Sequence, residues 1–441
     1  MAAESRGIEA KLSTFDTAMV VFSLVVGIGI FRTPAIVARE SGSAALFFAA
    51  WATGGLISLL GALTFAEIGS RHPRAGGYYR VVADCYHPVL AFMLNWAQTL
   101  MQGAGAAGVA FIGVEYLAPL VLPARWQTSQ SSLAMACALM LVLLVLNYAG
   151  VKTGARTQNL LSMLKIVMIV GLAALALLLA PRAASDAAAS APASWPRFAA
   201  ALIPCFYAYG GYQMTMNLGA DVKDARRRFP LAVTGGMLTV VGLYLLINLA
   251  YQRTLGTEGV AGAKLVAAAL SRATFGAGGE AVISVAIFLS AAGFVNATIL
   301  QMPRSFYAMA EDGVLHRAFL RVNPVTQVQE VGLVFFGITM LVPAFLLGSF
   351  EKLLNYVIFT DAVTLVVVAS TLFVLRRRAI GEGSFRMPGY PFTPAFYILC
   401  LFGVAVHVLV TETRLALVGT AILLTGWPLF QLGRRLTGSR D

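Results

Sequence analysis

The stretch VVGIGIFRTP, residues 25–34, lies in the middle of an apolar segment that runs from about Phe15 to Val37. That segment is long enough to cross the roughly 30 Å hydrocarbon core of a bilayer as a helix. Two glycines, an arginine and a proline interrupt it halfway. Since unpaired backbone N–H and C=O groups are not tolerated in contact with lipid, a break at this depth predicts a cavity enclosed by protein. The free backbone groups of such a break can bind a ligand.

Apolar segments of similar length recur along all 441 residues. Of these residues 59% are hydrophobic and 12% are charged, and the mean hydropathy is +0.78. Because soluble domains carry roughly 25% charged residues, the composition predicts an integral protein of the lipid bilayer. We expect one all-α polytopic domain, residues 1–441, with twelve transmembrane helices. The helices are predicted near residues 15–38, 44–68, 88–116, 132–149, 158–180, 198–219, 231–251, 280–310, 330–348, 353–375, 394–410 and 413–433.

The net charge of +12 is explained by the loops. Most Lys and Arg residues fall in loops on the same side of the membrane as the N-terminus, when the predicted helices alternate in direction. The positive-inside rule therefore places both termini in the cytoplasm, and the basic excess indicates no nucleic-acid partner. We expect no cleavable signal peptide before the first helix. These features predict a multi-pass protein of the cell membrane, with the bacterial inner membrane as the expected location.

No pattern in the sequence is typical of an enzyme or of cofactor binding. The four cysteines are scattered, and three lie in predicted helices, so they indicate neither a disulfide framework nor a metal site. The glycine pattern at residues 103–108 lies in an apolar helix and favours close helix packing over nucleotide binding. No cluster of acids and bases suggests hydrolysis. We therefore expect neither an enzyme nor a bound metal or cofactor.

A second interruption, YAYGGYQ at residues 207–213, lies midway through the sixth predicted helix. The first and sixth helices begin two successive sets of five helices, at residues 15–180 and 198–375. Two additional helices follow at residues 394–433. Corresponding breaks in two halves are typical of transporters built as inverted repeats with the binding site between them. The placement of the breaks thus predicts a five-plus-five inverted repeat with broken helices 1 and 6.

Several motifs, in order over about the first 320 residues, resemble those of the amino acid–polyamine–organocation superfamily of permeases. They include GIGIFRTP in the first helix, AEIG with GGYY at residues 66–79, and YAMAEDG at residues 307–313. The stretch YAYGGYQ is most similar to bacterial members of the L-type amino-acid transporter branch. The resemblance implies a leucine-transporter-like fold and secondary transport of an amino acid by alternating access.

An amino acid zwitterion requires donors for its carboxylate and acceptors for its ammonium, and a broken helix offers both. The resemblance implies that N–H groups of the first break hold the carboxylate and that carbonyls of both breaks hold the ammonium. Ile28 stands where the family often has Ser, so only its backbone N–H is available. The alternative is a merely kinked helix whose glycines pack on neighbouring helices. The implied substrate-binding residues are Val25, Gly27, Ile28, Gly29, Tyr207, Ala208, Gly210 and Asn296.

Two of these residues have further interpretations. By the resemblance, Tyr207 is the aromatic gate that closes over the substrate, with ordinary packing as the alternative. Asn296 in the eighth helix is a candidate substrate contact or an interhelical hydrogen-bonding residue. Neither break carries an acidic residue, which favours neutral substrates over cationic ones.

Lys165 lies within the fifth predicted helix, where an unpaired lysine costs roughly 2.5–3.5 kcal/mol or more. The resemblance places it beside the first helix, where related sodium-coupled transporters hold a sodium ion. Its ammonium can replace that ion, brace the broken helix and exchange a proton. The alternative is a lysine that snorkels to the membrane surface. Asp361 in the tenth helix is a candidate proton carrier, a partner of Lys165 or a structural hydrogen-bonding residue.

The sequence predicts a secondary active transporter of neutral amino acids. Either exchange or symport with protons fits, with the sodium site replaced by Lys165. One alternative is a proton-coupled transporter of an amine or other small metabolite. Another is a membrane sensor that keeps the fold without transport.

Overall fold

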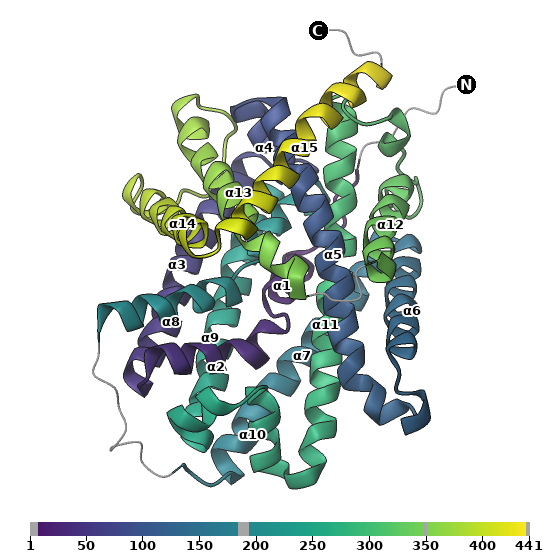
Figure 1. The fold of residues 1–441 in the computed structure, drawn as a ribbon. Helices are drawn as coiled ribbons and strands as arrows, with labels where there is room; N and C mark the ends of the chain where they lie inside the picture. Colours follow the sequence, from purple (N-terminus) through teal and green to yellow (C-terminus); the bar gives the residue numbers. More distant parts are fainter. Residues whose placement is uncertain (1–7, 184–193, 347–350, 438–441) are drawn as a thin grey trace.

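The computed structural model describes residues 8–183, 194–346 and 351–437. These residues form an all-helical fold, with two isolated β-bridges in place of any sheet (Figure 1). The α-helices are α1 Thr14–Val25, α2 Gly29–Ser41, α3 Ala44–Arg71, α4 Gly77–Cys85, α5 Pro88–Val121, α6 Ser129–Tyr148, α7 Val151–Leu179, α8 Trp195–Ala208, α9 Ala225–Gly262, α10 Val266–Phe275, α11 Gly279–Glu311, α12 Glu330–Leu346, α13 Glu351–Arg377, α14 Phe392–Thr411 and α15 Thr413–Thr437.

Nine helices in the described part of the chain are long and apolar enough to cross a membrane. Counting the bent pair α1 and α2 as one span gives ten. The prediction of a multi-pass, all-helical membrane protein is confirmed. The predicted count of twelve is not confirmed, because α8 has 14 residues and α12 has 17. The short α8 is followed by a segment of 3-10 helix, η3 Tyr212–Asn217.

Three elements differ from the sequence-based expectation. The polar hairpin between the second and third spans contains the amphipathic helix α4. Helix α9 is longer than predicted and has a kink at Gly256, where φ is 68°. A further short helix, α10, follows α9 and is not among the predicted transmembrane helices. Helices α4 and α10 lie at opposite ends of the molecule in Figure 1.

Helix α1 lies in the interior of the bundle and packs against α7, α9 and α11. Around it, α3 packs along α9 and α5 packs along α11, so each pair joins one predicted half to the other. The side chains of residues 19–25 are all buried. A helix that is apolar on every side is expected in such a place, since it has no solvated face. The first break therefore lies in the middle of the protein.

The start of α1 is fixed by a capping box. The Ser13 hydroxyl accepts from the Asp16 N–H at 3.1 Å, and the Asp16 carboxylate accepts from the Ser13 N–H at 2.8 Å. Asn159 of α7 donates to the same carboxylate at 2.6 Å. These contacts set where α1 begins and attach it to α7.

Ion pairs connect the helices at the end of the molecule that carries α4. Arg304 of α11 donates through two nitrogens to the buried carboxylate of Asp221, at 2.9 and 3.0 Å. His72 Nε2 lies 2.7 Å from Asp84 Oδ2. Burial raises the pKa of Asp84, but its hydrogen bond with His72 and the nearby positive charges hold that pKa below the ordinary value. These ion pairs therefore hold the elements together at this end of the molecule.

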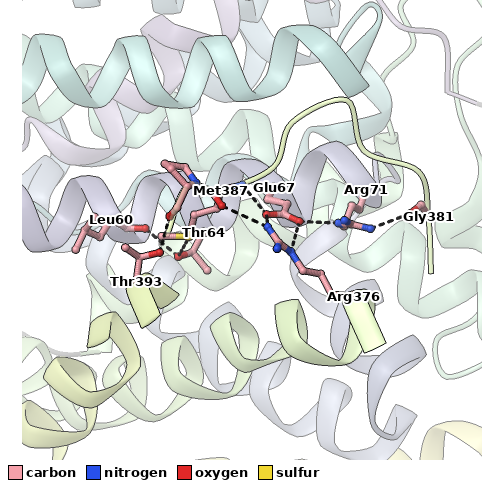
Figure 2. A network of polar contacts seen from close by, with 9 residues as sticks. Leu60, Thr64, Glu67, Arg71, Arg376, Gly381, Met387 and Thr393 are labelled. Carbon is pink, nitrogen blue, oxygen red and sulfur yellow. Dashed lines mark hydrogen bonds and ion pairs between the residues drawn. The ribbon is translucent and has the colours of Figure 1, made fainter. Parts of the chain in front are cut away.

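A network around Glu67 is the most connected of these contacts (Figure 2). The Glu67 side chain is fully buried and lies on α3. Its carboxylate accepts from Arg71 at 2.8 Å, from Arg376 of α13 at 2.6 and 2.8 Å, and from the Met387 N–H at 2.7 Å. One carboxylate thus joins α3, α13 and the connector that leads to α14.

We predict that Glu67→Gln lowers the thermal unfolding temperature of the purified protein, whereas Asp84→Asn changes it little. Removing one partner from a buried ion pair is strongly destabilising, by about 3–5 kcal/mol, because the remaining charge stays buried. Asp84 is a third exposed, and pairs at the surface contribute about 0–1 kcal/mol. Thermal unfolding in detergent measures both variants. Equal unfolding temperatures would show that the Glu67 network does not stabilise the fold.

Candidate functional site: two helix breaks beside a polar cavity

The first break separates α1 from α2 and bends the chain by 47°. Val26, Gly27 and Ile28 lie between the helices, and α2 begins at Gly29 with no side chain of the described residues capping it. The Phe31 N–H already donates to the Ile28 carbonyl at 3.1 Å, and the start of α2 carries the positive end of the helix dipole. Beyond its chain neighbours, a Cβ atom placed on Gly27 would meet no described atom within 4 Å. The turn thus faces open space.

The second break follows α8. After Tyr209, Gly210 and Gly211 the chain continues as the 3-10 helix η3. Gly211 has φ of 117°, a conformation that favours glycine. A Cβ atom on Gly211 would lie 2.3 Å from the carbonyl oxygen of Leu24, near the end of α1. The two breaks therefore pack directly on each other, and only glycine fits the contact.

Tyr244 of α9 joins the two breaks from a third helix. Its side chain is fully buried, and its hydroxyl lies 3.2 Å from the Val25 carbonyl and 3.1 Å from the Ala208 carbonyl. Each of these carbonyls belongs to the last residue of an interrupted helix. The sequence analysis did not identify Tyr244, because a single tyrosine in an apolar span does not by itself indicate a contact with the breaks.

The structure shows which backbone groups of the breaks already have partners. The Gly27 N–H donates to the Val25 carbonyl at 2.9 Å, and the Gly210 N–H donates to the Tyr207 carbonyl at 3.1 Å. Both carbonyls were predicted to accept from the ammonium of a substrate. In this conformation they have internal donors, whereas the start of α2 is uncapped. The predicted carboxylate site is therefore more open than the predicted ammonium site.

A cavity of about 200 Å³ lies beside the second break. Tyr207 and Gly210 line it, together with Leu24 at the end of α1. Its other walls come from α3, α5, α11, α13, α14 and η3. Residues 27–29 and Ala208 are not part of its lining. The breaks thus form one wall of the cavity, chiefly through the second break.

Tyr207 has the position expected of a residue that contacts a ligand in this cavity. Its hydroxyl is buried and has no hydrogen-bond partner among the described residues. Farther along, the hydroxyls of Tyr212 and Tyr397 lie 2.8 Å apart. Tyr397 belongs to α14, so one of the two helices outside the predicted repeat contributes to the cavity wall. The predicted gating role of Tyr207 stays a prediction.

Asp361 of α13 also lines the cavity. Its Oδ1 accepts from the side-chain amide of Gln98 of α5 at 2.9 Å. The absence of an acid from both breaks was the basis for favouring neutral substrates. That argument considered only the breaks, whereas the tenth predicted helix brings the carboxylate of Asp361 to the same cavity. The sequence did not indicate this, because Asp361 lies far from both breaks along the chain.

Asn296 is not brought to the cavity. Its side chain is fully buried, and its carbonyl oxygen accepts from Asn147 at 2.7 Å. Its amide nitrogen donates to Gln158 at 2.9 Å and to the Gly154 carbonyl at 3.2 Å. The candidate substrate contact is therefore not supported, and the alternative of interhelical bonding describes Asn296. It links α11 to α6 and α7.

Lys165 lies beside the first break, where the resemblance placed it. Its side chain is 1% exposed, which excludes snorkelling. Its Nζ donates to the Val26 carbonyl at 2.6 Å and to the Ser290 carbonyl at 3.3 Å. Because Lys165 bonds to these carbonyls and Asp361 bonds to Gln98, the two do not form the predicted pair. Lys165 places a positive charge at the C-terminal end of α1, where the helix dipole is negative.

Small side chains make room for this contact. Ser162, one turn before Lys165 on α7, bonds to the Ser23 hydroxyl at 2.8 Å and donates to the Met19 carbonyl at 3.0 Å. A Cβ atom on Gly293 of α11 would lie 3.2 Å from Lys165 Nζ. Three helices therefore fit closely around the lysine.

Two interrupted helices that pack together beside a cavity inside a polytopic helical protein define a membrane transporter of the broken-helix class. A family model described as "Amino acid permease" matches residues 12–427. The chain therefore belongs to the amino acid permease family of the amino acid–polyamine–organocation superfamily. The resemblance noted in the sequence is confirmed.

Three relatives illustrate the family. The chain is 29% identical to the serine/threonine exchanger SteT of Bacillus subtilis, over 98% of both chains. It is 27% identical to the human cystine/glutamate transporter, over 96% of this chain and 85% of that protein. It is 25% identical to the human Asc-type amino acid transporter 1, over 98% of this chain and 84% of that protein. The family and these relatives are transporters, so the chain is not an enzyme.

We predict that Gly211→Ala lowers thermal stability far more than Gly210→Ala. The added methyl group at Gly211 would lie 2.3 Å from the Leu24 carbonyl oxygen. It can be accommodated only if the two breaks move apart. At Gly210 the nearest atom is the Tyr207 carbonyl oxygen, 3.3 Å away. Thermal unfolding of the two purified variants makes the comparison. Similar unfolding temperatures would contradict the direct packing of one break on the other.

Proposed function

We propose that this protein is a secondary active transporter of amino acids that works by alternating access. The observation that carries the proposal is the contact of the two breaks beside the cavity at Tyr207 and Gly210. The uncapped start of α2 offers N–H donors and a positive dipole end for a carboxylate. Membership of the amino acid permease family, and the names of the relatives, support amino acids as the substrate class.

The proposal includes the architecture that the sequence predicts. Residues 15–180 and 198–375 are two inverted repeats of five helices, and residues 394–433 add two more, for twelve in all. The pairing of the interrupted α1 and α8 supports this division, because each begins one half. The basic loops support cytoplasmic termini, and the expected location is a bacterial inner membrane.

Lys165 supports a sodium-independent mechanism. Its ammonium already donates to the Val26 and Ser290 carbonyls, at the position proposed for a coupled sodium ion in related transporters. We therefore propose that Lys165 replaces that ion and holds the first break in shape. The driving force is then the gradient of a second substrate, as in exchange, or a proton gradient. The relative from Bacillus subtilis bears the name of an exchanger, which supports exchange.

Neutral amino acids remain the proposed substrates, since neither break carries an acid. A single observation favours the alternative of an amine. Asp361 lines the cavity, and its carboxylate can bind a positively charged amine there. The substrate panel of the first experiment must therefore contain both classes.

We predict uptake of a neutral amino acid into proteoliposomes that contain the purified protein. Labelled neutral and basic amino acids and an amine are tested with and without amino acid inside, and with and without a proton gradient. Flux only with internal amino acid indicates exchange, and accumulation under a proton gradient alone indicates symport. Replacing sodium with potassium should leave the rate unchanged. No flux for any member of the panel would refute transport.

We predict that Lys165→Ala lowers the maximal uptake rate at least tenfold in a protein that still folds. The variant leaves the Val26 carbonyl without its buried donor, which costs about 1–3 kcal/mol. Lys152→Ala is the matched control, because Lys152 lies on the same helix and is exposed. Uptake in Lys152→Ala should equal that of the wild type. Unchanged uptake in Lys165→Ala would remove the proposed role.

A further inference from the structure

The cavity contains one feature that the proposed transport mechanism does not use. Among the described lining residues, Asp361 is the one charged side chain. It lies on α13 and accepts a hydrogen bond from Gln98 of α5 through Oδ1. A carboxylate can accept roughly four hydrogen bonds, and Gln98 supplies the one recorded for Asp361 in the described part of the chain. Because Asp361 lines the cavity, its remaining acceptor capacity is available to a ligand there.

A carboxylate enclosed in a membrane protein requires a positive partner or a proton. The lysine nearest to the breaks cannot provide it, because Lys165 donates to the Val26 and Ser290 carbonyls and does not line the cavity. The carboxylate of Asp361 also forms no ion pair with any described residue. Among the described residues, therefore, no cation balances Asp361, which leaves a proton or a cationic ligand in the cavity to do so.

Other groups in the cavity suit an ammonium group. An ammonium has three donors and no acceptor. Beside the Asp361 carboxylate, the cavity offers the hydroxyl of Ser58 and the side-chain carbonyl oxygen of Gln98 as further acceptors. The aromatic rings of Tyr207 and Tyr397 line the same space, and such rings attract cations through their faces.

The backbone acceptors of the breaks are less available than this carboxylate. The Val25 carbonyl already accepts from the Gly27 N–H and lies 3.2 Å from the Tyr244 hydroxyl, and the Tyr207 carbonyl accepts from the Gly210 N–H. Donors lie toward the second break, where Gln213 accepts from the Gly211 N–H at 3.0 Å through its oxygen and keeps its NH₂ group as a donor. The cavity thus has donors near the break and a negative charge on α13.

We propose that Asp361, held in place by Gln98, binds the ammonium group of the substrate. The proposal rests on the proposed transport of amino acids and deepens it. The ammonium is either the α-amino group of any amino acid or the side-chain amino group of a diamino acid. Both have the same chemistry, and the choice decides whether the protein selects neutral or basic substrates.

The test measures uptake by proteoliposomes containing the wild-type protein or Asp361→Asn, which keeps the size of the side chain and removes its charge. The probes are L-serine and L-ornithine, with 3-hydroxypropionate, which is serine without its amino group, as a competitor. Asp224→Asn is the matched control, since Asp224 is exposed and lies in the connector before α9. Asp224→Asn should keep the wild-type KM for both amino acids.

We expect Asp361→Asn to raise the KM at least tenfold while inhibition by 3-hydroxypropionate stays unchanged. An equal effect on L-serine and L-ornithine assigns the α-ammonium, and an effect on L-ornithine alone assigns the side-chain ammonium. Unchanged KM for both probes overturns the proposal. Unchanged KM with loss of proton-driven accumulation overturns it too and assigns Asp361 to a proton. If the wild type transports no amino acid or amine, the proposed function itself has failed.

A second variant keeps the test decisive if Asp361→Asn does not fold. Gln98→Met leaves the carboxylate in place and removes the hydrogen bond that orients it. The expected result is a higher KM for the same probe, with recovery in Gln98→Asn, whose shorter amide keeps a donor. Wild-type KM in Gln98→Met would show that the orientation of Asp361 does not matter to the substrate, against the proposal.

Discussion

The contact between the two interrupted helices is the constraint on which the rest of the structure depends. Gly211 approaches the Leu24 carbonyl so closely that no side chain fits between them. The Tyr244 hydroxyl then lies within hydrogen-bond distance of the final carbonyls of both α1 and α8. Because helix ends expose unpaired backbone groups, a break inside a membrane must be supported by protein. Here each break supports the other, and α9 supports both.

Charge is distributed around this contact in a consistent way. Lys165 lies against the C-terminal end of α1, where its ammonium meets the negative end of a helix dipole. The positive start of α2 is left without a cap. Asp361 lies in the cavity on the side of α13. The cavity therefore presents a negative charge at Asp361, while the positive groups lie at the first break, outside the cavity lining.

Much of this was predictable from the sequence, because broken helices leave glycines in apolar spans. The motifs at residues 25–34 and 207–213 predicted both interruptions, and the family resemblance placed Lys165 beside the first of them. What the sequence could not show is which distant side chains reach the cavity. Asp361 and Gln98 reach the cavity from α13 and α5, and Tyr244 reaches the two breaks from α9, so only packing brings them there. For the same reason the sequence left Asn296 with two interpretations, since its polar partners lie on α6 and α7.

The central claim is that the cavity beside the paired breaks is where the substrate binds. It is tested most directly by a cryo-electron microscopy map of the protein in nanodiscs with a transported amino acid at saturating concentration. The account predicts ligand density in the cavity, in contact with Tyr207 and Gly210 and with its amino group toward Asp361. Density for the ligand outside this cavity, with the two breaks unoccupied, would contradict it.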